Sequence, residues 1–156
     1  MRSLHFAAAF ALFAAPALAQ TTLRIGIGAM FILHGWPKLA GGVAYWEAVG
    51  KAMEVVGITH APAFWGFMAG IGETVGGLLL VLGLFWRPAC LLLLAVMLVA
   101  TAKHLAAGDT FNDYSHAAEA AILFLALFFI GPGSYSLDSK FFPSDKYRSR
   151  FKRIVV

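Results

Sequence analysis

Charged residues are scarce in this chain of 156 residues: only 13% are Asp, Glu, Lys or Arg, whereas 60% are hydrophobic. The mean hydropathy of +0.78 is far above the value expected for a soluble domain of this size. No polar stretch is long enough to form a soluble catalytic domain. The composition therefore excludes a soluble enzyme and predicts an integral membrane protein.

Cysteine is almost absent, since Cys90 is the single one. One cysteine cannot form an intramolecular disulfide, which excludes thiol relay chemistry within the chain. The run PACLLLL favours a small buried apolar role for it. The sequence also lacks a Walker loop, a dinucleotide fingerprint and a nucleophile elbow. No HxxxH or ExxH pair fixes a metal geometry, so we assign no metal ligands.

Four apolar stretches are long enough to cross a hydrocarbon core of roughly 30 Å. They cover residues 21–40, 64–86, 88–105 and 116–133. Between the first two, VAYWEAVGKAMEVVG has the period of an interfacial amphipathic helix, either a lid or a plain connector. Its expected apolar face carries Tyr45, Trp46, Val49, Met53 and Val56. We predict an all-α fold, a transmembrane four-helix bundle with a short interfacial helix between spans one and two.

Positive charge gathers at the end of the chain. Residues 138–156 hold six Lys or Arg against two Asp, which accounts for the whole net charge of +4. The positive charge therefore does not indicate a nucleic-acid partner. Arg87 lies in the turn between spans two and three, and the other loops are acidic. The positive-inside rule then places both termini in the cytoplasm. An aromatic belt would put Trp86 at the inner interface and three tryptophans at the outer one, Trp36, Trp46 and Trp65.

The first 20 residues, MRSLHFAAAFALFAAPALAQ, look like a secretory signal peptide. Cleavage before Gln20 would leave the basic tail outside, which conflicts with the charge distribution. The alternatives are an extension along the inner interface, a continuation of the first helix, or a true start further downstream. We divide the chain into residues 1–20, a membrane domain of residues 21–137 and a basic cytoplasmic tail of residues 138–156.

Glu73 is the sharpest candidate for a functional residue. It lies about nine residues into its span, or roughly 14 Å deep. A charge at that depth costs at least about 2.5 kcal/mol, so Glu73 needs a partner, and Arg24 on the first span is a candidate counter-charge. The glycines around Glu73 are expected to allow close helix packing. These are Gly66, Gly70, Gly72, Gly76 and Gly77.

Other polar residues stand at the outer ends of the spans. In HGWPKL, His34 and Lys38 lie one helical turn apart on one face. With Glu73 and residues of the last two spans they would form an outer-half cluster: His34, Lys38, Glu73, Lys103, His104, His116 and Glu119. Plainer interpretations are snorkelling lysines, interfacial or packing histidines, and an acid favoured in the first turn of a helix.

Five motifs occur in order along the chain: LRIGIGAMF, HGWPKL, GIGETVGG, LGLFWRPA and GPGSYSLD. Together they resemble the DoxX family over roughly residues 23–138. Arg24, Gly35, Lys38, Glu73 and Arg87 occupy motif positions. The resemblance implies a small bacterial four-helix membrane protein with a redox role. DoxD relatives are the membrane subunit of a thiosulfate:quinone oxidoreductase, and other members act against oxidative or thiol stress or against quinones. The signal-like N-terminal segment departs from the family pattern.

These features lead to a hypothesis of an inner-membrane, quinone-linked redox subunit or member of a stress-response complex. Glu73, His34 and Lys38 are the candidates for proton handling and for binding the quinone head group. Candidates for the surrounding cofactor-binding cluster are Arg24, Lys103, His104, His116 and Glu119. Because the sequence carries no flavin, haem or iron–sulfur motif, the electrons are expected from a redox partner protein.

The remaining alternatives differ in kind. A non-catalytic anchoring or assembly subunit would use the same buried polar groups to hold the helices together. A small transporter is less favoured, because four spans without an inverted repeat offer little for alternating access. The lipid bilayer is a partner in each case, and a homo-oligomer is compatible with all of them.

Overall fold

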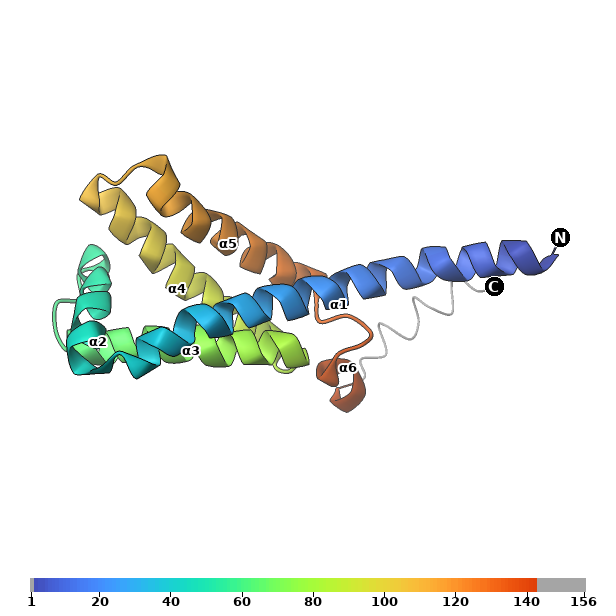
Figure 1. Cartoon of the computed structure of the whole chain (residues 1–156), viewed down its shortest axis with the longest axis horizontal. Coiled ribbons are helices and arrows are strands. Elements are labelled where there is room, and N and C mark those ends of the chain that lie inside the picture. Colours follow the sequence, from blue (N-terminus) through green and yellow to red (C-terminus); the bar gives the residue numbers. More distant parts are fainter. Residues whose placement is uncertain (1, 143–156) are drawn as a thin grey trace.

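The structure, a computed structural model, describes the backbone of residues 2–142 and the side chains of residues 16–142. Within these residues every regular element is helical, which confirms the predicted all-α fold (Figure 1). The elements in order are α1 (Arg2–Ala40), α2 (Gly42–Gly50), η1 (Lys51–Val56), α3 (Pro62–Leu82), α4 (Trp86–Ala107), α5 (Phe111–Ile130) and α6 (Leu137–Phe141).

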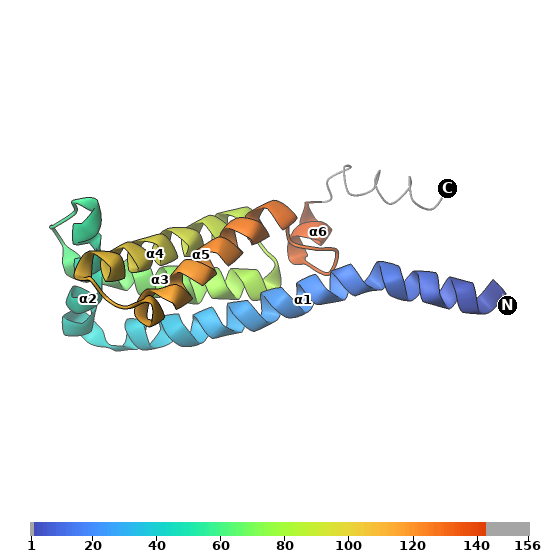
Figure 2. The same cartoon turned by 90° about the horizontal axis from the view of Figure 1, so that it is seen from above.

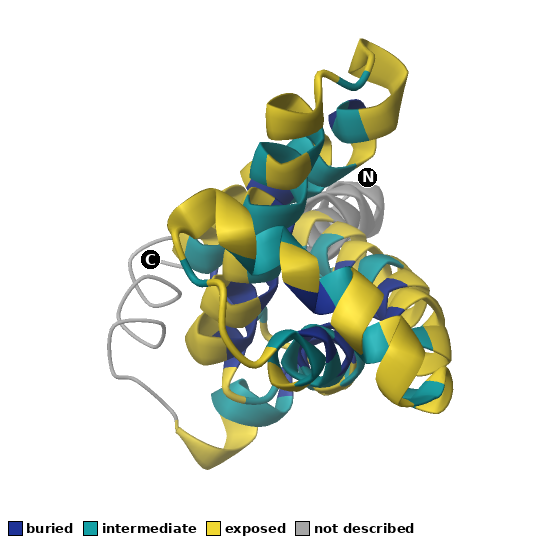
Figure 3. Ribbon diagram, turned by 90° about the vertical axis from the view of Figure 1, so that its left-hand side faces the viewer, coloured by how far each residue is buried: buried dark blue, intermediate teal, exposed yellow. Residues whose placement is uncertain are grey.

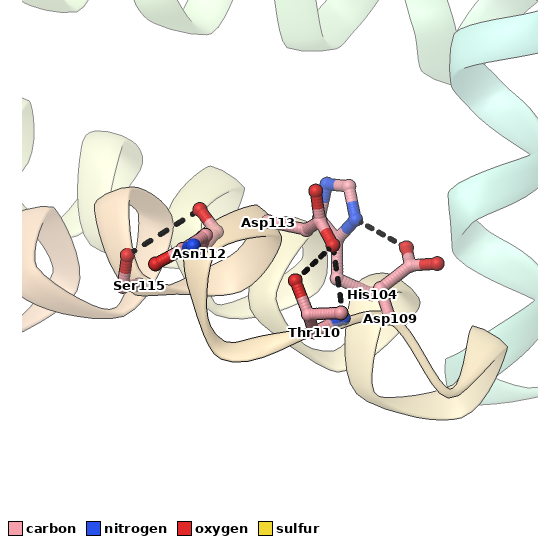
Figure 4. A network of polar contacts seen from close by, with 6 residues as sticks. All are labelled: His104, Asp109, Thr110, Asn112, Asp113 and Ser115. Carbon is pink, nitrogen blue, oxygen red and sulfur yellow. Dashed lines mark hydrogen bonds and ion pairs between the residues drawn. The ribbon is translucent and has the colours of Figure 1, made fainter.

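Four helices are long and apolar enough to cross a membrane: Pro16–Ala40, Pro62–Leu82, Trp86–Ala107 and Phe111–Ile130. This confirms the four predicted spans, with shifted boundaries. The last span begins at Phe111 rather than at residue 116, because Thr110 and Asp113 form a capping box (Figure 4). Because the first turn is polar, hydropathy alone did not include it in the predicted span.

Glycines bring α1 and α3 into backbone contact. A Cβ added at Gly28 would lie 2.6 Å from the carbonyl oxygen of Gly77, and the reverse addition gives the same distance. On a different face of α3, Gly76 accommodates the Leu93 side chain of α4. The predicted packing role of the α3 glycines is therefore confirmed, because they let one helix approach two neighbours at once.

The core lies where α1, α3, α4 and α5 meet, and Figure 3 shows buried residues facing the interior of the bundle. Cys90 is fully buried there, as expected. The belt position predicted for Trp86 is wrong: its side chain is only 1% exposed. Its indole Nε1 donates to the carbonyl oxygen of Leu127 over 2.7 Å. A buried acceptor at the end of α5 thus keeps this tryptophan in the core.

The predicted interfacial helix is present as two short helices, α2 and η1. Trp46 packs on Phe67, with ring centroids 4.8 Å apart, and its indole donates to the carbonyl oxygen of Lys38 over 2.7 Å. The polar face is exposed, as expected, whereas two residues of the expected apolar face, Tyr45 and Val56, are exposed as well. The 3-10 geometry of η1 changes the angle between successive side chains, which takes Val56 off that face.

The N-terminal segment continues the first helix, so that α1 runs without a break from Arg2 and projects beyond the bundle (Figures 1 and 2). This matches one of the alternatives above, a continuation of the first helix. The predicted basic tail is described only for residues 138–142, and residues 143–156 lie outside the described part of the chain.

Candidate functional site

An ion pair between Lys38 and Glu73 joins α1 to α3. The Lys38 Nζ lies 2.5 Å and 2.6 Å from the two carboxylate oxygens of Glu73. Glu73 is only 1% exposed, and Lys38 is partly buried. Gly35 makes this approach possible, because a Cβ there would lie 2.9 Å from the Cβ of Glu73. The buried acid and its nearest cation are thus two of the residues predicted from the sequence.

Arg24 is not the counter-charge of Glu73, and that prediction is wrong. Its guanidinium donates instead to the backbone carbonyl of Tyr135, in the segment that follows α5. Arg24 is 5% exposed, and its contact with Gly83 places it at the end of α3 opposite to the ion pair. Lys38 takes the partner role because it stands on the same face of α1 as Gly35, opposite Glu73.

A cavity of about 270 Å³ adjoins the ion pair. Lys38 and Glu73 contribute its charged groups, and its remaining walls are mainly apolar side chains of α2, η1, α3 and α4. Val49 and Met53 of the connector line it, so the connector forms part of the cavity wall as a lid would. The cavity thus has a few polar groups at one end and apolar walls elsewhere, which is typical of small-molecule sites.

Trp65 is a member of this site that the sequence did not reveal. Its side chain lines the cavity, and its indole Nε1 is buried without a hydrogen-bond partner among the described residues. A tryptophan near the start of a span is usually interpreted as a belt residue, and nothing in the sequence around Trp65 indicates a place in a cavity wall. A buried N–H without a partner is a ready donor for a ligand oxygen.

The other predicted residues do not join the ion pair. His34 is exposed and meets Phe31 edge-on at 6.1 Å between ring centroids. His104 contacts Asp109 through Nδ1 at 2.7 Å, in the loop between α4 and α5 (Figure 4). The remaining three are exposed: Lys103, His116 and Glu119. Figure 1 shows the reason, because α4 and α5 diverge from α1 and α3 toward the end where these residues lie.

The site offers donors and an acid rather than a ligand set for a metal. Within the described residues no three His, Cys, Asp or Glu side chains are placed to hold a metal ion. Lys38 has three N–H donors, Trp65 has one, and Glu73 can accept or release a proton. Such a set can bind carbonyl oxygens and exchange protons in a medium of low dielectric constant.

Comparison with known proteins agrees with this architecture. The family model described as DoxX matches residues 19–106, a range that includes Lys38, Trp65 and Glu73. An uncharacterized protein of Haemophilus influenzae is 38% identical over 133 residues, which covers 77% of this chain and 88% of that protein. No solved structure matches the chain. With the family model covering more than half of its length, this four-span membrane protein belongs to the DoxX family.

Proposed function

We propose that this chain is a quinone-linked redox subunit of the bacterial inner membrane, and that the cavity beside Lys38 and Glu73 takes a quinone head group. The observation that carries the proposal is a charged pair and an unpartnered indole N–H on the walls of one apolar cavity. A volume of about 270 Å³ is below the range typical of pockets for whole drug-sized ligands, roughly 300 to 1,000 Å³. It suits a single substituted ring.

Lys38, Trp65 and Glu73 would each have a separate role in the reduction of a quinone. Reduction of a quinone to a quinol takes up two electrons and two protons. Lys38 and Trp65 would donate hydrogen bonds to quinone oxygens. Glu73, which is paired with Lys38, would pass both protons to the quinone oxygens in turn, taking up each one from the aqueous phase. A partner protein would supply the electrons. His34 lies on the exposed side of α1 and has no place in the cavity wall.

The proposed topology has both termini in the cytoplasm and the α2–η1 connector at the outer surface. It is supported by the acidic outer loops and the basic C-terminal residues of the sequence. A reporter that works only in the cytosol should be active when it is fused after Val156. Alkaline phosphatase activity from that fusion would overturn the arrangement.

Glu73→Gln tests the proton role, because it keeps the shape and hydrogen-bonding capacity of the side chain and removes the titratable proton. We expect a folded protein at the parent's membrane level that no longer supports quinone-dependent stress survival in cells lacking the native gene. Glu47→Gln, on the exposed face of α2, is the matched control and should behave as the parent. Full survival with Glu73→Gln at equal protein level would exclude Glu73 as a proton donor.

A second function, a non-catalytic assembly or anchoring subunit, is favoured by one observation. Lys38 contacts both oxygens of Glu73, so the pair satisfies itself and holds α1 against α3 without a ligand. This alternative predicts that Glu73→Gln retains function, whereas Glu73→Leu loses folded protein because Lys38 is left unpaired. The two substitutions together therefore separate the two functions.

A further inference from the structure

The cavity beside the ion pair is covered at its outer end. Val49, Ala52 and Met53 of the connector line it there, and η1 packs against both α3 and α4. The connector is seated tightly, since a Cβ added at Gly50 would lie 1.7 Å from the carbonyl oxygen of Pro62. Its charged residues Glu47, Lys51 and Glu54 are all exposed. A ligand arriving from the aqueous phase would have to displace this connector.

The α4 side of the cavity is different. Its lining residues are all apolar and run from Leu92 to Ala100, which is about 12 Å along the helix axis. Leu92 is 40% exposed, and Ala95 is also exposed. Both lie in the middle of a helix that is long and apolar enough to span the membrane, so the surface that they expose outside the cavity faces lipid rather than water. The cavity thus reaches the bilayer beside α4, where Ala95 contributes only a methyl group.

We propose that the ligand enters sideways from the bilayer, through a portal between α3 and α4 marked by Leu92 and Ala95. This inference rests on the function proposed above and adds the substrate class: a quinone with an apolar tail, whose tail stays in the portal. The head group lies against Lys38, Glu73 and Trp65. Ala95 is then a residue that determines specificity for tailed over tail-less quinones.

Size and solvation support this route. A cavity of about 270 Å³ holds a ring and leaves no room for a long tail, which must continue outside. A tail that leaves through an apolar rim into lipid stays in a hydrocarbon medium throughout, whereas one directed to the outer surface would cross charged headgroups and water. The small side chain at Ala95 leaves the width that a methylene chain needs.

The test compares two probes on protein in nanodiscs of phosphatidylcholine and phosphatidylglycerol, with empty nanodiscs as the blank. One probe is a tail-less dimethoxy-methyl-benzoquinone, and the other is the same ring with a decyl chain. Binding is measured by titration calorimetry. Ala95→Phe fills the portal, and Ala95→Leu fills it less. Leu98→Phe adds the same ring one turn away, at an exposed position outside the cavity lining.

We expect Ala95→Phe to weaken binding of the decyl quinone by about tenfold or more, with less than a threefold effect on the tail-less ring. Ala95→Leu should give an intermediate loss, and Leu98→Phe should match the parent. Equal weakening of both probes, or no weakening of the decyl quinone in well-folded Ala95 variants, would overturn the portal while leaving the head-group site intact. Failure of the parent to bind either probe would overturn the proposed function itself, and the portal with it.

Discussion

The two ends of this bundle bury polar side chains in different ways. At the end that the proposed topology places toward the cytoplasm, called the inner end, they bind the backbone: Asp138 accepts from the N–H groups of Phe85 and Trp86 over 2.9 Å and 2.8 Å. Arg24 donates to the carbonyl of Tyr135. At the outer end Lys38 and Glu73 bind each other and adjoin a cavity.

This difference separates structural from functional polar groups. Backbone partners fix turns, and the Asp138 carboxylate occupies the N-terminus of α4, where the positive end of the helix dipole favours an anion. A pair of side chains is less constrained, because either member can turn to a ligand while the helices stay in place. The outer pair is therefore suited to chemistry, and the inner contacts are suited to holding the fold.

Removing the acid from the outer pair should have the largest effect on stability. We expect Glu73→Leu to lower the free energy of unfolding by about 2 to 4 kcal/mol, since Lys38 is left without its partner in a poorly hydrated site. The value lies below the cost of a fully buried charge because Lys38 is partly exposed. Denaturant unfolding in mixed micelles measures it.

The double variant Lys38→Met/Glu73→Leu is the control for that result. It replaces both charges by apolar groups of similar size, so most of the stability should return while quinone binding stays lost. A double variant as unstable as Glu73→Leu alone would mean that packing of the Glu73 side chain, rather than its charge, stabilises the outer end.

The contact between α1 and α3 that places the ion pair can be tested at Gly35. A Cβ there would lie 2.4 Å from the Oγ1 and 2.6 Å from the backbone nitrogen of Thr74. We expect Gly35→Ala to cost about 1 to 3 kcal/mol and to weaken quinone binding as the helices separate. Gly26→Ala on the same helix meets nothing within 4 Å and should be neutral or slightly stabilising. Equal stability of the two variants would contradict this close approach.

The sequence predicted the features that depend on hydropathy and period. The four spans followed from apolar length, and the burial of Glu73 followed from its depth. The partner of Arg24 could not be predicted, because it is a backbone carbonyl in an irregular segment that returns to α1. His116 and Glu119 were misplaced for another reason: depth along a span says nothing about the divergence of α5 from α1 (Figure 1).

A smaller effect on the free energy of unfolding is expected from substitutions at the inner end. Asp138→Ala removes the acceptor of two N–H groups at the start of α4, one of them on Phe85, which has a positive φ of 46°. We expect a loss of about 1 to 2 kcal/mol in unfolding free energy, with quinone affinity of the folded protein unchanged. Asp109→Ala is the control, because its partner His104 is partly exposed and that pair should contribute less than about 0.5 kcal/mol. A loss of quinone affinity in Asp138→Ala would show that the inner end also serves the site.

The smallest effects on stability and on quinone affinity are expected for substitutions on α5. They test whether the polar residues of α5 belong to the ligand site or are plain surface residues. His116 and Glu119 are exposed, and α5 leaves the bundle on the side away from α3 (Figure 1). Glu119→Gln and His116→Ala should therefore each change the unfolding free energy by less than about 0.5 kcal/mol and leave decyl quinone affinity as in the parent. The same calorimetric titration in nanodiscs measures this. If either substitution weakens binding of the decyl quinone as strongly as Ala95→Phe does, these residues close over the cavity in the membrane, and the ligand site extends from α3 to α5.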